Sequence, residues 1–199
     1  MENALKNLIT SNFNESIEAK QKACVILAEP VYQAALLIIN AFKSGNKLLI
    51  CGNGGSAADS QHFAAEFTGR YEMERTPLPA IALTTDSSAL TAIGNDYSFD
   101  VVFSKQVEAL GQANDILFGI STSGNSVNVM RAIEIAHDKG MIVIILTGKN
   151  GGKMASMLKD GDVNINSPLG RTARIQETHL LVLHTLCDVI DNALFKLSK

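Results

Sequence analysis

Residues 47–56 read KLLICGNGGS, a short apolar run that ends in a turn rich in glycine. A helical pattern of apolar residues follows the turn, over Ser56–Gly69. A short apolar run that leads through glycine into a helix is typical of a buried parallel strand at the start of a βαβ unit. This stretch therefore predicts an α/β fold.

The same succession of strand and helix recurs along the chain. Helices are expected over Ser98–Gly111 and Ser126–Lys139, and over Arg171–Phe195 at the end of the chain. Four further apolar runs predict strands: Pro79–Leu83, Asp115–Ile120, Met141–Thr147 and the weaker Val163–Ile165. This alternation predicts a parallel five-stranded sheet with helices on both faces.

The first 44 residues form a separate helical pattern. Apolar residues recur at helical spacing from Phe13 onward, and Val31–Phe42 is apolar on almost every side. Such a segment indicates burial and is consistent with burial against another subunit. Pro30 fits either a position within one long helix or the first turn of a second helix. We expect one domain over residues 1–199, with a helical extension (1–44) and an α/β core that includes the terminal helix (45–199).

Composition excludes several classes of protein. Hydrophobic residues make up 46% and charged residues 19%, an ordinary globular mixture. The net charge of −3 gives no electrostatic footprint for direct binding of nucleic acid or of an anionic membrane. Three scattered cysteines fit buried reduced thiols better than disulfides or a thiolate metal site. Residues 1–14 lack the apolar segment of a signal peptide, so we expect a cytoplasmic protein.

Two loops after predicted strands are rich in glycine and in hydrogen-bonding groups. Ligands of open parallel sheets bind beyond the carboxyl ends of the strands. Glycines at 52, 54 and 55 would let a ligand approach the backbone, and Ser56 is expected to cap the next helix. The second loop, Ser121–Ser126, presents four hydroxyl groups at a helix N-terminus, which suits an anion. Both loops also fit simple capped turns, but neither matches a nucleotide-binding motif, so a sugar phosphate is the preferred ligand.

Two helices carry side chains suited to acid–base or metal chemistry. His62 and Glu66 are four residues apart and share a helix face. Gln176 and His184, on the last helix, project to broadly similar sides. Together these four groups fit a divalent metal site, zinc included. Alternatively, Glu66 and His184 form an acid–base pair that moves a proton between adjacent carbons of a sugar. Taken singly, the first pair also fits a surface position and His184 a core position.

Five segments of the chain resemble the sugar isomerase (SIS) family, in the order expected of that family: CGNGGSAADSQHFAAEFTGRY (Cys51–Tyr71), AIGNDYSF (Ala92–Phe99), GISTSGNS (Gly119–Ser126), LTGKNGG (Leu146–Gly152) and ARIQETH (Ala173–His179). The resemblance covers almost the whole chain. It implies a SIS domain with a flavodoxin-like doubly wound sheet, assembled as a homotetramer with active sites between subunits. The implied reaction converts sedoheptulose 7-phosphate to D-glycero-D-manno-heptose 7-phosphate by enediol chemistry, the first step toward ADP-heptose and the lipopolysaccharide core.

The resemblance also implies roles for individual residues. Glu66 would be the catalytic base and His184 the partner acid. The phosphate would be held by Ser121, Thr122, Ser123 and Ser126. Other contacts to the substrate would come from Asn53, Gly54, Gly55, Glu66, Asn95, Asp96 and Gln176. One zinc ion per subunit would be bound by His62, Glu66, Gln176 and His184.

A sister branch of the family offers an alternative function. Its members associate with the bacterial replication initiator protein, and residues 84–112 and 186–195 look closer to that branch. The branch departs from the catalytic pattern at the positions of Glu66 and His184, which this chain retains. A polar pair on apolar helices is costly and is easier to explain if the pair is functional. We therefore prefer the isomerase to a non-catalytic adaptor.

Overall fold

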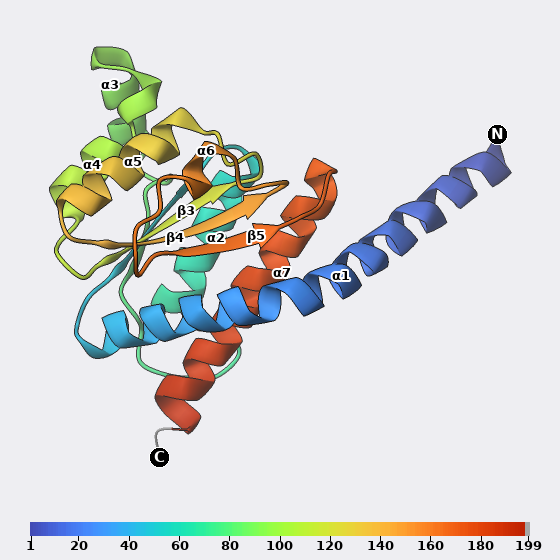
Figure 1. Ribbon diagram of the computed structural model, residues 1–199, viewed down its shortest axis with the longest axis horizontal. Coiled ribbons are helices and arrows are strands. Elements are labelled where there is room, and N and C mark those ends of the chain that lie inside the picture. Colours follow the sequence, from blue (N-terminus) through green and yellow to red (C-terminus); the bar gives the residue numbers. More distant parts are fainter. Residues whose placement is uncertain (198–199) are drawn as a thin grey trace.

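One parallel sheet of five strands organises the molecule (Figure 1). The computed structural model describes residues 1–197 of the chain. The strands lie in the order β2-β1-β3-β4-β5, and each pairs in parallel with its neighbours. Their bounds are β1 Leu48–Gly52, β2 Ala80–Ala82, β3 Ile116–Ser121, β4 Ile142–Gly148 and β5 Val163–Ser167. The central strands β1 and β3 are buried along their whole length because helices cover both faces.

Two hydrophobic clusters divide the helices between the faces of the sheet. One cluster packs alternate strand residues against α1 (Glu2–Lys43), α2 (Gly55–Thr68) and α7 (Thr172–Asp191). The other cluster packs the opposite strand residues against α4, α5 and α6, with partly buried residues of α3 beside them. The bounds of these helices are α3 Ser87–Asp96, α4 Ser104–Leu110, α5 Val127–Asp138 and α6 Gly152–Ala155. This arrangement is the doubly wound α/β fold that the sequence predicts.

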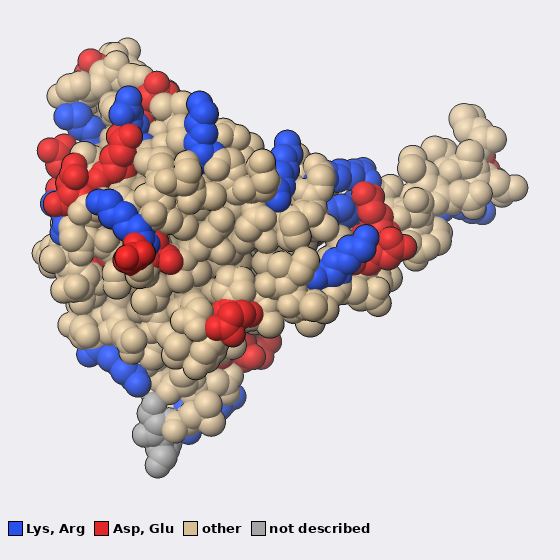
Figure 2. All heavy atoms as spheres, in the orientation of Figure 1, with Lys and Arg blue, Asp and Glu red and all other residues tan. Residues whose placement is uncertain are grey.

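The first helix is a single long element that extends beyond the rest of the molecule. Pro30 lies inside α1, so the alternative of two helices is not realised. The second half of α1 packs against α7 and β5, whereas its first turns project as an arm (Figures 1 and 2). By length and composition, α1 is the one helix within residues 1–197 that could cross a membrane. Because its second half packs against α7 and β5, α1 has the position of a core helix in this fold.

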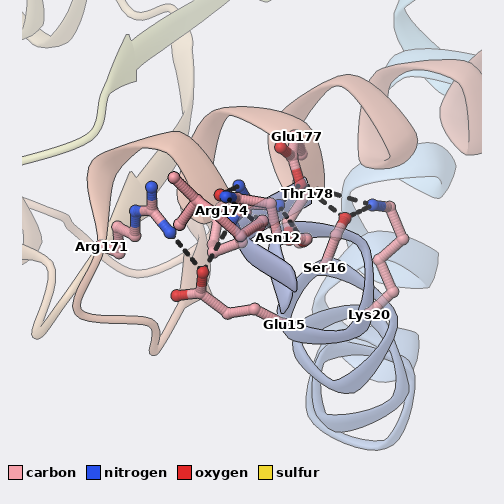
Figure 3. Close-up of polar contacts among 9 residues, drawn as sticks. Asn12, Glu15, Ser16, Lys20, Arg171, Arg174, Glu177 and Thr178 are labelled. Carbon is pink, nitrogen blue, oxygen red and sulfur yellow. Dashed lines mark hydrogen bonds and ion pairs between the residues drawn. The ribbon is translucent and has the colours of Figure 1, made fainter. Parts of the chain in front are cut away.

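Polar contacts fix the base of this arm to the start of α7 (Figure 3). Arg174 donates to the backbone carbonyl of Asn12 at 3.0 Å and to Glu177 at 2.9 Å. Glu177 also accepts from the hydroxyl of Ser16 at 2.6 Å, and Arg171 pairs with Glu15. The Ser16 hydrogen bond is the main cause of a lowered pKa at Glu177. These contacts set the angle at which α1 leaves the body of the protein.

Some local predictions differ from the structure. The helix expected over Ser98–Gly111 is divided into a 3₁₀ turn at Phe99–Val101 and the separate helix α4. Helices α3 and α6 were not expected, although Asp86 caps α3 by accepting from the backbone N–H of Ala89 at 2.9 Å. Cys24 is exposed, whereas the other two thiols are buried as expected.

Candidate functional site

The two unusual loops lie side by side at the carboxyl end of the sheet. Strand β1 is followed in sequence by β2 on one side and pairs with β3 on the other, so the strand order reverses between β1 and β3. Gly52, the last residue of β1, is in register with Ile120 near the end of β3. The chain then leaves β1 into the glycine loop (residues 52–55) and β3 into the serine loop (residues 121–126). Such a reversal point is where ligands bind in open parallel sheets.

Glycines in the first loop make room for a side chain from α7. Gly54 has a positive φ of 56° and precedes the first residue of α2. Ser56 is buried inside that helix, and no side chain caps it, so the predicted cap is wrong. A Cβ at Gly55 would lie 2.1 Å from Nε2 of Gln176. The glycine loop and α7 are therefore in direct contact, and a side chain on residue 55 would displace the amide of Gln176.

A pair of amides joins the glycine loop to the serine loop. The side chain of Asn53 donates to Asn128 at 2.8 Å and accepts from it at 2.9 Å. Asn128 is buried in the first turn of α5. Asn128 is not among the predicted site residues, because an asparagine next to a serine loop has no distinguishing spacing. This contact uses one N–H and one acceptor position of the Asn53 amide and fixes its orientation, which leaves a second N–H on the side chain for a ligand.

Hydroxyl groups converge within the serine loop. The hydroxyl of Ser121 lies 2.9 Å from that of Ser126 and 3.5 Å from that of Ser123. The backbone N–H of Gly124 also donates to Ser121 at 3.1 Å. No side chain caps α5, which begins directly after Ser126. Clustered hydroxyl groups at an uncapped helix N-terminus form a favourable site for a phosphate.

A second glycine turn, at residues 151–152, packs against the serine loop. Gly124 and Gly152 both have positive φ, and a Cβ at Gly124 would meet the carbonyl oxygen of Gly151 at 1.9 Å. The backbone N–H of Met154 donates to the carbonyl of Gly124 at 2.9 Å. The N–H of Lys153 donates to the side chain of Asn125 at 3.0 Å. Backbone packing of this closeness fixes the conformation of the loop.

The two histidine-bearing helices meet beside the glycine loop. Nε2 of His62, on α2, lies 2.8 Å from Nε2 of His184, on α7. The carboxylate of Glu66 lies 3.3 Å from the same His62 nitrogen. The ring of Tyr71 packs 5.6 Å, centroid to centroid, from the ring of His184. The structure thus brings His62, Glu66 and His184 together, with Gln176 two turns earlier on α7.

Asp59 adds a further carboxylate to the same helix face. It lies three residues before His62, and its Oδ2 atom is buried without a hydrogen-bond partner among residues 1–197. Burial raises the pKa of the Asp59 carboxyl, and the positive charge of His62 partly offsets that increase. Asp59 is not among the predicted site residues, although its spacing from His62 and Glu66 places all three on one side of α2.

The side chains of His62, Glu66, Gln176 and His184 have the chemistry of zinc ligands, but their spacing differs from that of a formed zinc site. Two imidazoles, a carboxylate and an amide suit this ion chemically. The two imidazole nitrogens are 2.8 Å apart, whereas two nitrogens on tetrahedral zinc are about 3.3 Å apart. Within residues 1–197, no three His, Cys, Asp or Glu side chains are grouped to hold a metal by themselves. The amide of Gln176 and a small separation of the rings are therefore needed for a zinc site.

Asn95 and Asp96 lie apart from this cluster. They end α3, are exposed, and hydrogen-bond to each other at 3.0 Å. Figure 1 shows α3 at the edge of the molecule, beyond α4 and α5. The structure therefore does not bring these two predicted substrate-binding residues to the histidine pair within one chain.

Comparison with known proteins identifies relatives over almost the full length. The profile of the SIS domain matches residues 12–148. A phosphoheptose isomerase of Neisseria gonorrhoeae is 61% identical over 192 residues, which cover 96% of this chain and 98% of that protein. A solved structure of phosphoheptose isomerase from N. gonorrhoeae has a TM-score of 0.90 and 60% identity, covering 94% of this chain and 99% of the other. One from Francisella tularensis has a TM-score of 0.91 and 46% identity, covering 94% and 97%. These relatives give no support to the adaptor alternative.

Proposed function

The chain belongs to the SIS-domain family and, within it, to the phosphoheptose isomerases, and from this membership we propose how its residues perform the reaction. The proposed reaction converts sedoheptulose 7-phosphate to D-glycero-D-manno-heptose 7-phosphate. The observation that supports this assignment of residues is that Glu66 on α2 and His184 on α7, which are distant in sequence, both lie against His62.

Proton transfer is assigned to Glu66 and His184. The carboxylate of Glu66 removes a proton from C1 of the ketose, which leaves an enediolate across C1 and C2. The same carboxyl then returns a proton to C2, and the product is the aldose. His184 protonates the oxygen on C2 and accepts the proton from the oxygen on C1, so the overall reaction neither gains nor loses atoms. An acid and a base on opposite sides of the reacting carbons are what such an isomerisation requires.

Binding of the substrate is assigned to the two loops and α7. Ser121, Thr122, Ser123 and Ser126 hold the phosphate, with the N-terminus of α5 adding a favourable dipole. Asn53, Gly54, Gly55 and Gln176 contact the sugar chain between the phosphate and the acid–base pair. The contact of Gly55 with Gln176 supports this order, because it places the glycine loop between the serine loop and α7.

Zinc is assigned to His62, Glu66, Gln176 and His184. Bound there, the ion would supply a Lewis acid that stabilises negative charge on the substrate oxygens. The convergence of the two imidazoles on α2 and α7 supports this assignment.

Assembly into a homotetramer is proposed because the single chain leaves apolar surface exposed and the site incomplete. A groove of about 380 Å³ between α1 and α7 is lined mainly by apolar side chains, with Lys20, Thr178 and Thr185 among them. The projecting arm exposes Leu5, Leu8, Ile9, Phe13 and Ile17. Contiguous apolar surface of this kind marks a protein interface. A neighbouring subunit would also provide the means for Asn95 and Asp96 to reach a substrate.

We further propose a cytoplasmic location, one SIS domain over residues 1–199, and a role in lipopolysaccharide-core synthesis.

The test is isomerisation by the purified protein, followed by proton NMR in deuterium oxide with and without added zinc. The unaltered protein is expected to form the aldose, and deuterium at C2 would indicate exchange of the transferred proton with solvent. Glu66→Gln keeps the size of the side chain but removes the base, so turnover is expected to fall at least 1000-fold, within the contribution of general base catalysis.

The control for this variant is its fold. Glu66→Gln should give the same circular dichroism spectrum and the same oligomeric state as the unaltered protein. Retention of full turnover by this variant would exclude Glu66 as the base. Absence of product from a folded, tetrameric protein would contradict the proposed reaction itself.

A further inference from the structure

A buried arginine joins the two helices that carry the acid–base pair. Arg75 lies in the segment between α2 and β2, and its side chain is 1% exposed. Its Nε donates to the carboxylate of Asp191, at the end of α7, at 2.9 Å. We propose that this contact, here called the Arg75 clamp, is a positioning device for the acid–base pair. The proposal builds on the proposed function, which assigns proton transfer to Glu66 and His184.

The clamp holds the end of α2 through its backbone. Nη2 of Arg75 donates to the carbonyl of Glu66 at 2.8 Å, and Nη1 donates to the carbonyl of Phe67 at 2.8 Å and to that of Gly69 at 3.0 Å. The last turn of a helix leaves its carbonyls without partners, and a cation there also favours the helix dipole. Arg75 is therefore bonded directly to the backbone of Glu66.

On its other side, the clamp contacts α7 at Asp191, two helical turns from the ring of His184. His184 and Asp191 are seven residues apart, which is two helical turns, so both project toward α2. The guanidinium also lies 5.9 Å from the ring centroid of Phe195, just past the end of α7. A single rigid, planar group thus connects the backbone at Glu66 to the helix face that carries His184.

A buried ion pair is weak evidence for stability, because removing both charges from water costs about as much as their attraction returns. The fork of Arg75 has a second effect: it sets the separation and rotation of α2 relative to α7. The 2.8 Å contact of His62 with His184 spans the same pair of helices. A displacement of about 1 Å in the position of catalytic groups can lower the rate by about 100-fold, even when the altered residue does not touch the substrate.

The test compares two matched variants. Asp191→Asn weakens the clamp but keeps an oxygen for Nε of Arg75. Asp115→Asn alters another buried carboxylate, which pairs with Lys47 at 2.6 Å near the amino ends of β1 and β3, away from the site. For each variant, kcat, KM, the thermal midpoint and the imidazole ¹⁵N chemical shifts of His62 and His184 are measured. The shifts report the geometry of the pair independently of activity.

We expect Asp191→Asn to lower kcat about 10- to 100-fold and to move both imidazole signals. KM should change less than about threefold, because the serine loop makes no contact with the clamp. Asp115→Asn should lower the thermal midpoint by a similar amount but leave kcat within about twofold and the imidazole signals in place. Equal losses of kcat in the two variants would overturn the proposal.

A double variant, Arg75→Met with Asp191→Leu, separates positioning from stability. Apolar replacement of a buried ion pair commonly maintains or increases stability. The double variant leaves no unpaired buried charge, so its thermal midpoint should be higher than that of Arg75→Met alone, although the carbonyls of α2 lose their donor. It should not regain kcat, and recovery of kcat would overturn the clamp. If the unaltered protein shows no isomerisation, the proposed function fails, but the ¹⁵N shifts of His62 and His184 still test the clamp. A change of these shifts in Asp191→Asn would support the clamp, and unchanged shifts would overturn it.

Discussion

His179 shows how burial determines the chemistry of one residue. Its ring is fully buried on α7, and Nε2 donates to the carbonyl of Thr147 at 3.0 Å. Its Nδ1 atom has no hydrogen-bond partner within the described part of the chain. Burial lowers the pKa of His179 from 6.5 to about 4. The ring is therefore neutral at physiological pH and acts as a fixed donor to the end of β4.

This low pKa predicts a specific dependence of stability on pH. Between about pH 6.5 and pH 4 the unfolded chain binds a proton at residue 179 and the folded chain does not. The free energy of unfolding should therefore fall as the pH is lowered through this interval, by up to about 3 kcal/mol from this residue. His179→Gln keeps a donor but does not titrate. Urea unfolding at a series of pH values should give a flatter profile for the variant, and identical profiles would contradict the lowered pKa.

Sequence spacing alone identified some site residues and missed others. His62 and Glu66 were found because a spacing of four residues has a direct meaning on a helix. Arg75 and Asn128 were not found, because their roles depend on partners distant in sequence, Asp191 and Asn53. Such tertiary contacts leave no periodic signal. The roles assigned to the catalytic and substrate-binding residues remain predictions.

At the level of elements, the serine loop depends on the glycine turn packed against it. A Cβ on Gly152 would meet the carbonyl oxygens of Ser123 and Gly124 at 2.5 Å. Gly152→Ala should therefore displace the serine loop and raise KM for the sugar phosphate about 10- to 100-fold, through weaker hydrogen bonds to a charged group. Steady-state kinetics with varied substrate would measure the change.

Gly161→Ala provides the matched control for this prediction. Gly161 also has a positive φ, of 95°, but a Cβ there would meet nothing within 4 Å. Both substitutions strain the backbone, at a cost of about 1–3 kcal/mol. Only Gly152→Ala should change KM. A similar KM for the two variants would show that the packing of the glycine turn does not control the loop.

The strands were more predictable than the helices at this scale. All five strands begin and end within two residues of the predicted runs. Strands that are buried on both faces have a continuous apolar sequence, which makes them easy to find. Helix α3 was missed because none of its residues is buried. Its partly buried residues Leu90 and Ile93, three apart, and its cap at Asp86 were the signals available in the sequence.

At the scale of the whole molecule, the groove between α1 and α7 is the surface where we propose that subunits meet. Leu181 lines the groove and is 44% exposed, whereas Leu110 on α4 is 41% exposed and lies on the opposite face of the sheet. If the proposed homotetramer uses this groove, Leu181→Lys should shift the protein to smaller species, because a lysine is costly to bury unpaired at an interface. Light scattering coupled to size-exclusion chromatography would measure this.

The same substitution at Leu110 is the control and should leave the oligomeric state of the unaltered protein unchanged. Dissociation by both variants would indicate a general loss of folding, which circular dichroism would reveal. Persistence of the tetramer in Leu181→Lys would place the subunit interface outside the groove.

The packing of α1 against α7 also has a consequence for how the protein is made. These two helices come from the first and last parts of the sequence, and their contact closes the core. During synthesis the apolar face of α1 leaves the ribosome well before α7, the helix against which it packs. A chain with contacts of such long sequence separation folds slowly and exposes apolar surface in the meantime. The nascent chain is therefore expected to need chaperone protection until translation is complete, after which α7 covers the second half of the first helix.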